Sequence, residues 1–446
     1  MEKRIIGICT DYTYDGKGIV KKDKLVVFVD NVIKGEKVEV EIVHSSKNQT
    51  LGKLVNIIEA SPYRVKPFCP LAKECGGCVL QHINYKKQLE FKTSHVQDCI
   101  NKIAKLDIKV NDCIGMENPY NYRNKSQVPF SINNKKICYG FYKQNTHKIV
   151  QMNSCKIQTE DADDILRTIK NLMEKYRISA YEEDKRKGTI RHVLIKKGFS
   201  TNQIMVVLIT NVLSFPNRKE FVKELVKTYP NIKTVIQNIN TRDTNVILGE
   251  KESVLYGNGY IEDILLDVKF KISSKSFYQV NPLQTATLYS KAIELADLKK
   301  TDRVLDAYCG IGTIGLIASK KVNEVIGVEI VADAIKDAKS NALVNNIKNA
   351  NFVLDDASKF MVNFAKTTEK IDVVFVDPPR KGCDERFLNS LMKLAPKKVV
   401  YISCNPSTLA NDLKTLKEKY DVKVVQPVDM FPHTYHVETI ALLHLK

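Results

Sequence analysis

The alternation of short apolar strands with helical patterns over residues 271–446 most constrains what this chain can fold into. The strand-like runs are RVLDAYC, EVIGVEI, ANFVLDD, IDVVFVDPP and KKVVYISC, and helical patterns such as ADAIKDAKSNALVNN lie between them. Parallel strands need crossover connections, usually helices, and strands covered on both faces appear as nearly continuous apolar runs. The pattern therefore predicts an α/β fold, with a doubly wound, mostly parallel sheet over residues 263–446.

The part of the chain before this region has a different pattern. Short β-rich runs separated by turn signals predict a small OB-like β-barrel over residues 1–60. Residues 82–105 carry apolar side chains at helical spacing, and strand-like runs dominate after them. A chain of 446 residues has room for about three domains, so we expect a central α+β domain over residues 61–262.

The net charge of +18 is unevenly distributed. Residues 61–160 contain 16 Lys and Arg against 7 Asp and Glu, whereas residues 1–60 contain 10 against 9. A basic stretch of this kind favours a polyanion partner such as nucleic acid, with a solvated basic surface as the alternative. No apolar run reaches the roughly 18 residues of a membrane span, and MEKRIIGICT does not resemble a signal peptide. We therefore expect a cytoplasmic monomer that does not enter a membrane.

The turn after the first strand of the α/β region is rich in glycine. RVLDAYCG runs directly into GIGTIG, so Gly310, Gly312 and Gly315 occupy the turn and the start of the next helix. Glycines there let backbone N–H groups approach a ligand, although tight strand-to-helix packing also needs small residues. Glu329 ends the next strand, where an acid can accept ribose hydroxyls, and Asp356 follows the third strand, where it can bind an adenine amine.

The glycine spacing differs from the GxGxxG of dinucleotide folds, because DAYCGIGTIG shifts the glycines and adds the aromatic Tyr308. With VDPPR at 376–380, the set resembles S-adenosylmethionine-dependent methyltransferases. The cationic sulfonium of that cofactor suits a pocket of carboxylates with an aromatic face. Methyltransferases of exocyclic adenine amines carry an aromatic residue after the DPP motif, so Arg380 is a departure from that group.

A cysteine stands at the exit of the strand VVYISC. Cys404 precedes Asn405 and Pro406, which enforce a turn, so its thiol lies where ligands of open α/β sheets bind. A small apolar filler is the alternative. Carbon 5 of a pyrimidine is a poor nucleophile, but a thiolate added to carbon 6 makes an enolate whose carbon 5 can take a methyl group. Nitrogen and oxygen acceptors need no such help, so Cys404 indicates a pyrimidine acceptor.

Such an adduct also needs a base that removes the proton from carbon 5. Glu438, in DMFPHTYHVETIALLHL, follows His433 and His436 and precedes an apolar strand, which predicts a carboxylate at the rim of the sheet. A surface charge at a strand end is the alternative. Ionising a thiol with a pKa near 8.5 costs on the order of 2 kcal/mol at neutral pH, and a nearby cationic cofactor can lower that cost.

Three of the 11 cysteines form a C-x5-C-x2-C pattern in PFCPLAKECGGCVLQH. These are Cys69, Cys75 and Cys78, and in a cytoplasmic chain such a cluster indicates a metal site before it indicates disulfides. His82 as the fourth ligand would complete a zinc site, whereas Cys155 would complete an all-thiolate set suited to an iron–sulfur cluster. The spacing alone does not distinguish the two.

The motifs DAYCGIGT, DPPRKG, SCNP and FPHTYHVE, in this order and spacing, resemble those of the bacterial RNA uracil-5-methyltransferases of the 23S ribosomal RNA and tRNA group. The resemblance covers essentially the whole chain. It implies S-adenosylmethionine-dependent methylation of uridine carbon 5 in RNA, with 23S ribosomal RNA as the expected substrate. A tRNA uridine, a cytosine acceptor, and an RNA-binding metalloprotein with an inactive catalytic domain are the alternatives.

The resemblance also implies roles for particular residues, with Cys404 as the nucleophile and Glu438 as the base. The implied cofactor-binding residues are Gln279, Tyr308, Thr313, Glu329, Asp356 and Asp377. The implied ligands of a [4Fe–4S] cluster are Cys69, Cys75, Cys78 and Cys155. Residues 1–60 resemble the RNA-binding TRAM module, and the helix near 82–105 is expected to dock on the Rossmann-like methyltransferase domain.

Candidate RNA contacts lie in the basic segment NYRNKSQ. Tyr122 is suited to a base contact, and Arg123 and Lys125 are suited to phosphates. A solvated face is the alternative for each of them. A structural cluster that ties residue 155 to the loop 69–78 would hold this basic segment in place.

Overall fold

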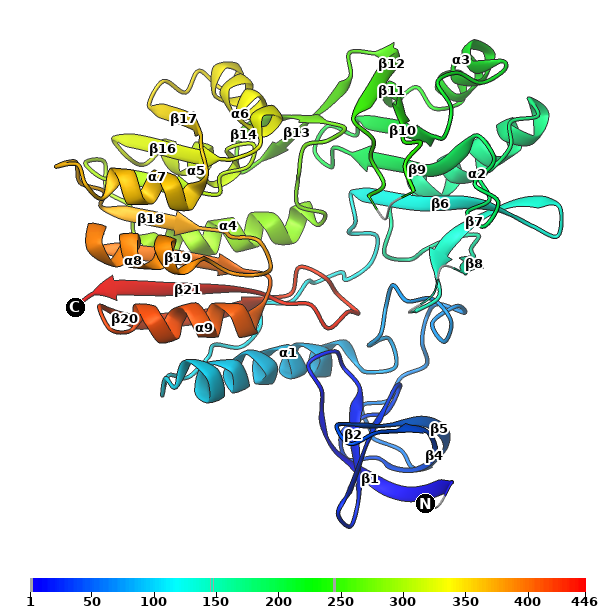
Figure 1. Ribbon diagram of the computed structural model, residues 1–446, viewed down its shortest axis with the longest axis horizontal. Helices are drawn as coiled ribbons and strands as arrows, with labels where there is room; N and C mark the ends of the chain where they lie inside the picture. The colour runs from blue at the N-terminus through cyan, green and yellow to red at the C-terminus, as the bar shows by residue number, and fades with distance from the viewer. Residues whose placement is uncertain (1–2, 145, 147, 244–245) are drawn as a thin grey trace.

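The structure is a computed structural model that describes residues 3–144, 146, 148–243 and 246–446. Figure 1 shows a small barrel at the N-terminal end, a central sheet, and a C-terminal sheet with helices along it. In the described part of the chain, no helix is long and apolar enough to cross a membrane. The α/β class and the N-terminal barrel agree with the sequence-based expectation.

The N-terminal strands close into a barrel in the order β1-β2-β3-β5-β4. Buried and exposed residues alternate along β1, so one face of each strand points inward, as a closed sheet requires. Val20, Val27, Val38 and Val40 are among the fully buried residues that fill the interior. The barrel strands are β1 (Arg4–Tyr12), β2 (Gly18–Lys22), β3 (Leu25–Val29), β4 (Lys37–Ser45) and β5 (Thr50–Glu59).

The central sheet has seven strands in the order β12-β11-β10-β9-β6-β7-β8. Two helices cover one of its faces, because Ile165 of α2 and Leu225 of α3 share a core with Val128 of β6 and Val193 of β9. The elements are β6 (Lys125–Asn133), β7 (Lys136–Tyr142), β8 (Ile149–Gln151), α2 (Glu160–Lys175), β9 (Ile190–Lys197), β10 (Ile204–Thr210), α3 (Arg218–Thr228), β11 (Ile232–Ile239) and β12 (Lys251–Gly257).

A two-stranded hairpin joins the central sheet to the C-terminal region. It consists of β13 (Tyr260–Leu265) and β14 (Val268–Ser273), which pair antiparallel. β13 contacts β10 and β11, while β14 contacts α5 and α6 of the C-terminal region. The domain boundary expected near residue 262 therefore falls inside an element that touches both regions.

The C-terminal sheet also has seven strands, in the order β17-β16-β15-β18-β19-β21-β20. The strands from β17 to β19 in this order are parallel, whereas β21 runs antiparallel to both β19 and β20. Glycine at 327 is required in β16, because a Cβ there would come within 2.6 Å of the Phe352 ring. The strands are β15 (Arg303–Ala307), β16 (Glu324–Glu329), β17 (Ala350–Leu354), β18 (Val373–Val376), β19 (Lys398–Ser403), β20 (Tyr420–Val428) and β21 (Glu438–Leu445).

Helices pack on both faces of this sheet (Figure 1). Leu288 of α4 and Leu316 of α5 belong to one core, while Leu391 of α8 and Leu409 of α9 belong to the other. Both cores are made mostly of fully buried aliphatic residues, whose burial is the main favourable term in folding. The helices are α4 (Pro282–Ala296), α5 (Thr313–Ser319), α6 (Ala332–Val344), α7 (Ala357–Phe364), α8 (Glu385–Leu394) and α9 (Pro406–Leu416).

A helix from the front of the chain completes the second of these cores. α1 (Tyr85–Cys99) continues into the π-helical turn η1 (Ile100–Ala104) and begins at Asn84, whose side chain accepts a hydrogen bond from the Lys86 N–H. Val96 and Ile100 are fully buried in the same core as residues of α9. α1 therefore packs against α9 and β20, although the central sheet separates it from them in the sequence.

A buried ion pair anchors α1 to the C-terminal segment. Lys92 Nζ donates to Asp429 Oδ1 at 2.5 Å and to the Phe431 carbonyl at 3.1 Å, and both charged side chains are fully buried. Tyr85 Oη donates to Asp429 Oδ2 at 2.8 Å. The Asp429 carboxylate thus has a partner for each oxygen, which a buried charge needs. These contacts hold the chain directly ahead of β21.

Replacing Lys92 by methionine is expected to lower the free energy of unfolding by about 3–5 kcal/mol, because Asp429 would keep a buried charge without its cation. Denaturant titration at neutral pH measures this change. Lys102→Met, at an exposed residue of η1, is the matched control and should change stability by less than about 0.5 kcal/mol. The double variant Lys92→Met/Asp429→Leu should recover much of the loss. A Lys92→Met protein as stable as the wild type would contradict the importance of the pair.

Candidate active site

The ends of several strands bring polar side chains to one edge of the C-terminal sheet. Parallel strands such as β15, β18 and β19 all have their carboxyl ends at this edge. Because β21 is antiparallel to β19, its first residues lie beside the last residues of β19, with Thr439 opposite Ser403. Cys404, directly after β19, and Glu438, the first residue of β21, are therefore close in space although they are distant in sequence.

Cys404 occupies a tight strand-to-helix turn. The Asn405 N–H donates to Ser403 Oγ at 3.1 Å, and the Asn405 side chain accepts from the Ser407 N–H at 3.1 Å, which caps α9. Pro406 is the first residue of α9, where its missing N–H is not needed. Asn405 Nδ2 also donates to the Arg380 carbonyl at 3.2 Å, so the turn after β19 is tied to the turn after β18. The thiol is left partly exposed.

Two carboxyl groups lie near this thiol, the buried Glu438 and the half-buried Asp377. Burial raises the pKa of Glu438 to about 8, and the Asp377 carboxylate raises it further, while Arg380 opposes the shift. Burial raises the pKa of Asp377 to about 7. Each group is therefore easier to hold in its neutral form than an exposed acid.

The same environment acts on the thiol. Burial raises the pKa of Cys404 to about 11, the charges of Glu438 and Asp377 add to the increase, and Arg380 opposes it. A nucleophilic thiolate therefore needs a cation nearby or a neutral pair of carboxyl groups beside it. Arg380 supplies one positive charge at this edge. It occupies the position after DPP where methyltransferases of exocyclic adenine amines carry an aromatic residue.

The glycine-rich turn after β15 is held by two acids. Glu329 accepts from the Gly310 N–H at 3.1 Å through Oε2 and from the Val331 N–H at 2.9 Å through Oε1. Asp306 Oδ2 accepts from the Gly315 N–H at 2.8 Å, and a Cβ at Gly315 would come within 2.9 Å of that oxygen. This close approach explains why glycine is required at 315.

The other predicted cofactor residues lie around the same edge. Tyr308 has a positive φ of 72° and its ring lies 5.5 Å from that of Phe387, while Thr313 opens α5. Asp356 caps α7 by accepting from the Lys359 N–H at 2.9 Å. Gln279 lies near Tyr289, a buried tyrosine whose pKa is raised mainly by burial and next by Asp377, while Gln279 opposes the increase.

Asp306 and Arg380 are polar residues at this edge to which sequence analysis gave no role. Asp306 is buried at the end of β15, and its Oδ1 has no hydrogen-bond partner in the described part of the chain. Burial raises its pKa to about 7. The sequence contained a signal for Asp306, namely an acidic residue inside the apolar run RVLDAYC. Burying a carboxylate costs free energy, so an acid in a buried strand indicates a function or a specific partner.

The predicted RNA contacts divide into two groups. Arg123 and Lys125 line a cavity next to the cysteines, and the charge of Arg123 contributes to lowering the pKa of His436 to about 4, although burial is the main cause. Tyr122, in contrast, is only 1% exposed, and its hydroxyl donates to the Pro432 carbonyl at 3.1 Å. The Tyr122 ring therefore lies inside the protein, so it does not present a face to a base.

The four predicted cluster ligands, Cys69, Cys75, Cys78 and Cys155, line one cavity of about 360 Å³. Burial raises the pKa of Cys78 to about 12, and the three other cysteines add to the increase. The Gly77 N–H donates to Cys75 Sγ at 3.4 Å, a contact that favours a thiolate. Among the described residues, no three Cys, His, Asp or Glu side chains already converge on a single metal position.

His82, the other candidate for a fourth ligand, does not line this cavity. It is buried, and the pKa of its imidazole is lowered to about 4, mainly by burial and then by the charge of Arg64. The sequence left either His82 or Cys155 as the fourth ligand. Only with Cys155 do all four proposed ligands line the same cavity.

Comparisons with known proteins identify the class of enzyme. The chain matches the family model described as tRNA (Uracil-5-)-methyltransferase over residues 84–446. It is 47% identical over 435 residues to an RNA methyltransferase of Bacillus cereus, covering 97% of this chain and 95% of the relative. An RNA methyltransferase of Clostridium tetani is 46% identical over 429 residues, covering 96% and 93% of the two chains.

A solved structure resembles the whole fold. The tRNA (uracil-54, C5)-methyltransferase of Pyrococcus abyssi, in complex with S-adenosyl-L-homocysteine, matches with a TM-score of 0.80 and 28% identity, covering 98% of this chain and 100% of that one. The fold and the matches define an S-adenosylmethionine-dependent RNA methyltransferase. The chain belongs to the tRNA (uracil-5-)-methyltransferase family, as the resemblance of its motifs implied.

The raised pKa of Glu438 predicts a pH-dependent contribution to stability. Between the usual value of 4.5 and about 8 the folded protein binds the Glu438 proton more tightly than the unfolded chain does. Stability from this group is therefore lost as the pH rises through that window, by up to about 1.4 kcal/mol per pH unit. Glu438→Gln should become progressively more stable relative to the wild type from pH 5 to pH 8, measured by denaturant titration.

The raised pKa values of Asp377 and Asp306 make similar contributions, which are present in both proteins and largely cancel in this comparison. Glu117→Gln, at an exposed residue, is the control and should show a difference from the wild type that does not change with pH. A stability difference for Glu438→Gln that is flat over the same range would rule out the raised pKa.

Proposed function

We propose that the protein methylates carbon 5 of a uridine in RNA through a covalent bond between Cys404 and carbon 6 of the base. The observation that carries the proposal is the juxtaposition of Cys404, Glu438 and Asp377 at one edge of the sheet. A thiol and a carboxyl group on neighbouring strands are the two groups that this chemistry needs on either side of a pyrimidine ring.

The proposed reaction follows from the atoms available. When bound, S-adenosylmethionine supplies an electrophilic methyl group. Cys404 gives its proton to solvent and its sulfur adds to carbon 6, so that the electrons of the double bond form an enolate. Carbon 5 takes the methyl group, whose bond to the cofactor sulfur would break and leave a neutral thioether, and Glu438 then accepts the proton from carbon 5. The electron pair of that C–H bond restores the double bond as the sulfur of Cys404 leaves.

The electrostatics of the site fit a cationic ligand. Glu438 and Asp377 have raised pKa values because of burial, so a positive charge close to them would favour their ionised forms. Ionised Glu438 is the form that can act as the base. The residues that we propose hold the cofactor are Gln279, Tyr308, Thr313, Glu329, Asp356 and Asp377. Glu329 already accepts two backbone hydrogen bonds, and each carboxylate oxygen retains a further lone pair for a ribose hydroxyl.

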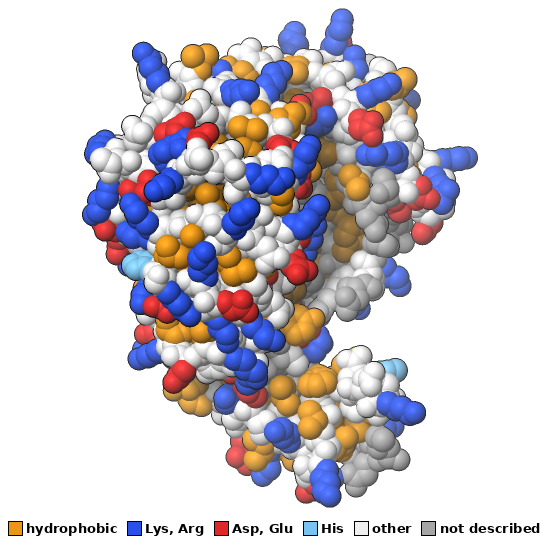
Figure 2. Space-filling model, turned by 60° about the vertical axis from the view of Figure 1, so that its left-hand side comes forward, with side chains coloured by type: hydrophobic (Ala, Val, Ile, Leu, Met, Phe, Trp, Pro, Cys, Tyr) orange, Lys and Arg blue, Asp and Glu red, His pale blue; other side chains and the backbone are white. Residues whose placement is uncertain are grey.

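We propose 23S ribosomal RNA as the substrate, with a tRNA uridine as the second candidate. The proposal of 23S ribosomal RNA rests on the set of four cysteines, because the motif resemblance links such a set to the ribosomal RNA branch of the family. The second is favoured by the likeness to the Pyrococcus abyssi enzyme, which is a tRNA (uracil-54, C5)-methyltransferase. Figure 2 shows Lys and Arg side chains distributed over the face that it presents, consistent with a polyanionic substrate and a net charge of +18.

The domains and the RNA-contacting residues are proposed as follows. We propose that residues 1–60 form a TRAM-like RNA-binding barrel, residues 61–262 the central domain and residues 263–446 the catalytic domain. Arg123 and Lys125 are proposed to contact the RNA. The protein is proposed to act as a cytoplasmic monomer. Figure 2 shows a hollow between the barrel and the larger body, a place where RNA would reach both.

Cys404→Ala is expected to reduce methylation by at least about a thousandfold, because no other group forms the bond to carbon 6. RNA that contains 5-fluorouridine should form a denaturation-resistant adduct with the wild type in the presence of S-adenosylmethionine, since the fluorine cannot be removed as a proton. The assay is run with 23S ribosomal RNA and with tRNA, so the adduct also identifies the substrate. Cys138→Ala, at a cysteine of the central sheet, is the control and should form the adduct. An adduct that persists in Cys404→Ala would eliminate the proposed nucleophile.

We propose that Cys69, Cys75, Cys78 and Cys155 hold a [4Fe–4S] cluster with a structural role. The support is their common cavity and the raised pKa of Cys78, because four thiols that border one cavity become thiolates together only with a cation between them. Cluster ligation would join the loop at 69–78 to the segment that precedes α2, next to Arg123 and Lys125.

The wild-type protein, purified without oxygen, is therefore expected to be brown and to contain iron and acid-labile sulfide. Cys78→Ala should lose both, as measured by visible absorption and metal analysis, whereas Cys138→Ala should keep them. Zinc in place of iron in the wild type, or iron that is unchanged in Cys78→Ala, would contradict the cluster assignment.

A further inference from the structure

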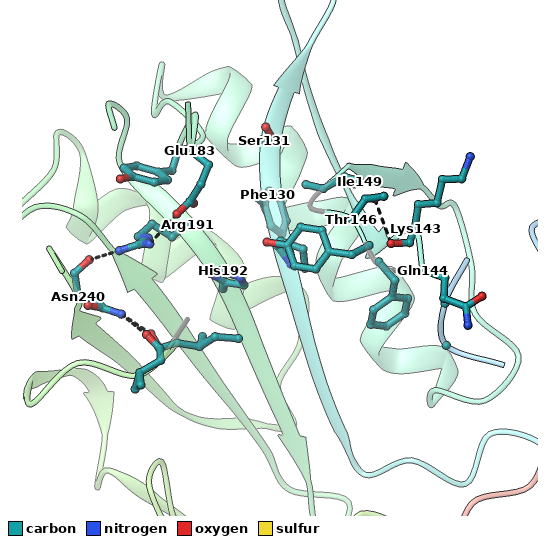
Figure 3. A pocket seen from close by; sticks show the side chains of 18 residues that line it. Phe130, Ser131, Lys143, Gln144, Thr146, Ile149, Glu183, Arg191, His192 and Asn240 are labelled. Carbon is teal, nitrogen blue, oxygen red and sulfur yellow. Dashed lines mark hydrogen bonds and ion pairs between the residues drawn. The ribbon is translucent and has the colours of Figure 1, made fainter. Parts of the chain in front are cut away.

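A cavity of about 730 Å³ lies on the face of the central sheet that α2 and α3 leave uncovered. β6 and β9 form its floor, and the register places Pro129 opposite His192. Figure 3 shows labelled polar side chains on both sides of this cavity, with Phe130 and His192 between them. The labelled polar side chains are Glu183, Arg191 and Asn240 on one side and Lys143, Gln144 and Thr146 on the other.

Arg191 is fixed at the cavity wall by several contacts. Its Nη1 donates to the Asn240 carbonyl at 3.0 Å, and its Nη2 donates to Glu183 Oε1 at 3.2 Å. The guanidinium lies 4.6 Å from the centre of the Tyr181 ring, and the side chain is only 4% exposed. An arginine held in this way presents a rigid planar surface with little entropy left to lose when a ligand binds.

Two buried polar atoms in the cavity wall have no hydrogen-bond partner in the described part of the chain. Among the described residues, none hydrogen-bonds Arg191 Nε or His192 Nδ1. His192 is 8% exposed, and the pKa of its imidazole is lowered to about 4 by burial and then by the charge of Arg191. A neutral imidazole offers one donor and one acceptor. Leaving such atoms unpaired costs free energy, so a ligand that satisfies them would be bound favourably.

The chemistry of the wall fits an unpaired nucleotide better than other ligand classes. A nucleobase has polar edges for the imidazole of His192 and a flat face for the half-buried ring of Tyr142, which lines the cavity. A purely apolar ligand would leave the buried polar atoms unsatisfied. Lys143 lines the cavity and can offer its charge to a phosphate, whereas Glu183 disfavours an anion beside it.

The cavity lies next to the cysteine-lined cavity. It shares Gly77 and Phe141 with the cysteine-lined cavity, and Arg123 and Lys125 border the latter. Six residue steps separate Arg123 from Pro129, and the chain enters β6 at Lys125, so the two residues are about 20 Å apart along an extended chain. One RNA segment can therefore pass Arg123 and reach this cavity.

We propose that this cavity binds an unpaired nucleotide of the substrate RNA other than the one that is methylated. The proposal rests on the proposed function in that it takes RNA as the substrate. Such a second contact would set which uridines fit the active site, because a base bound here restricts the RNA conformations that bring a uridine to Cys404.

The test compares RNA binding by Arg191→Gln and His192→Ala with that of the wild type, using a full-length 23S ribosomal RNA transcript and a tRNA transcript in filter binding at fixed salt. Each variant is expected to raise the Kd about tenfold for the transcript that is bound. Arg167→Gln, at an exposed arginine of α2 on the opposite face, is the matched control and should bind as the wild type does. His192→Ala keeps the test decisive if Arg191→Gln does not fold.

Photocrosslinking to the same transcripts carrying 4-thiouridine provides the second measurement. Peptides that contain Phe130 or Arg191 should crosslink to RNA in the wild type and not in His192→Ala. Wild-type binding by His192→Ala, or crosslinks confined to other parts of the protein, would overturn the proposal. Competition by adenosine monophosphate alone without any change in RNA binding would overturn it in favour of a free-nucleotide site. Neither measurement requires methylation. A negative result in the adduct assay, which would contradict the proposed function, is therefore distinguishable from a negative result for RNA binding in this cavity.

Discussion

The contact between Lys92 and Asp429 is the interaction on which the geometry of the active site depends. Two opposite charges are fully buried, and the aspartate is also bound by Tyr85. A buried pair of this kind persists only when both partners are present, so it specifies one position of α1 against the C-terminal segment. The next strand, β21, begins at Glu438 a few residues later. A helix from the front of the chain thus helps to position the carboxylate beside Cys404.

Burial has the same electrostatic consequence at three acids of this edge. Glu438, Asp377 and Asp306 all have raised pKa values with burial as the first cause. An apolar environment disfavours several negative charges close together, so the edge is poised to accept a positive one. In the proposed reaction that charge belongs to the cofactor, and it would favour both the thiolate of Cys404 and the ionised base. Cofactor binding and activation of the nucleophile would then be linked.

The front half of the chain completes a route for RNA in the proposed function. Arg123 lines the cysteine-lined cavity, and His436, whose imidazole is kept neutral mainly by burial, is near enough to feel its charge. Continuing along β6, the uncovered face of the central sheet leads to the cavity with Arg191 and His192. A cluster at the four cysteines would stiffen the loop between these two places. Recognition and chemistry would therefore occupy different sheets that are joined by β13 and β14.

Much of the fold was predictable from local patterns. The alternation of strands and helices after residue 271 and the β-rich runs before residue 60 depend on side-chain periodicity and turn chemistry, which act over a few residues. Cys404 was identifiable for the same reason, because Asn405 and Pro406 place a turn directly after an apolar strand. Tyr122 shows the limit of such patterns: the segment is basic and polar, but the ring is buried against Pro432.

The sequence by itself determined the types of elements, the order in which they occur, and the chemical groups available at the strand ends. Only the tertiary structure decided which groups meet. The antiparallel insertion of β21 beside β19 brings Glu438 to Cys404, the docking of α1 buries Lys92 against Asp429, and the folding of the front half brings Cys155 to the same cavity as Cys78. The physical reason is that strand register and helix docking are set by burial across the whole chain, whereas the signals in a short stretch reach only its neighbours.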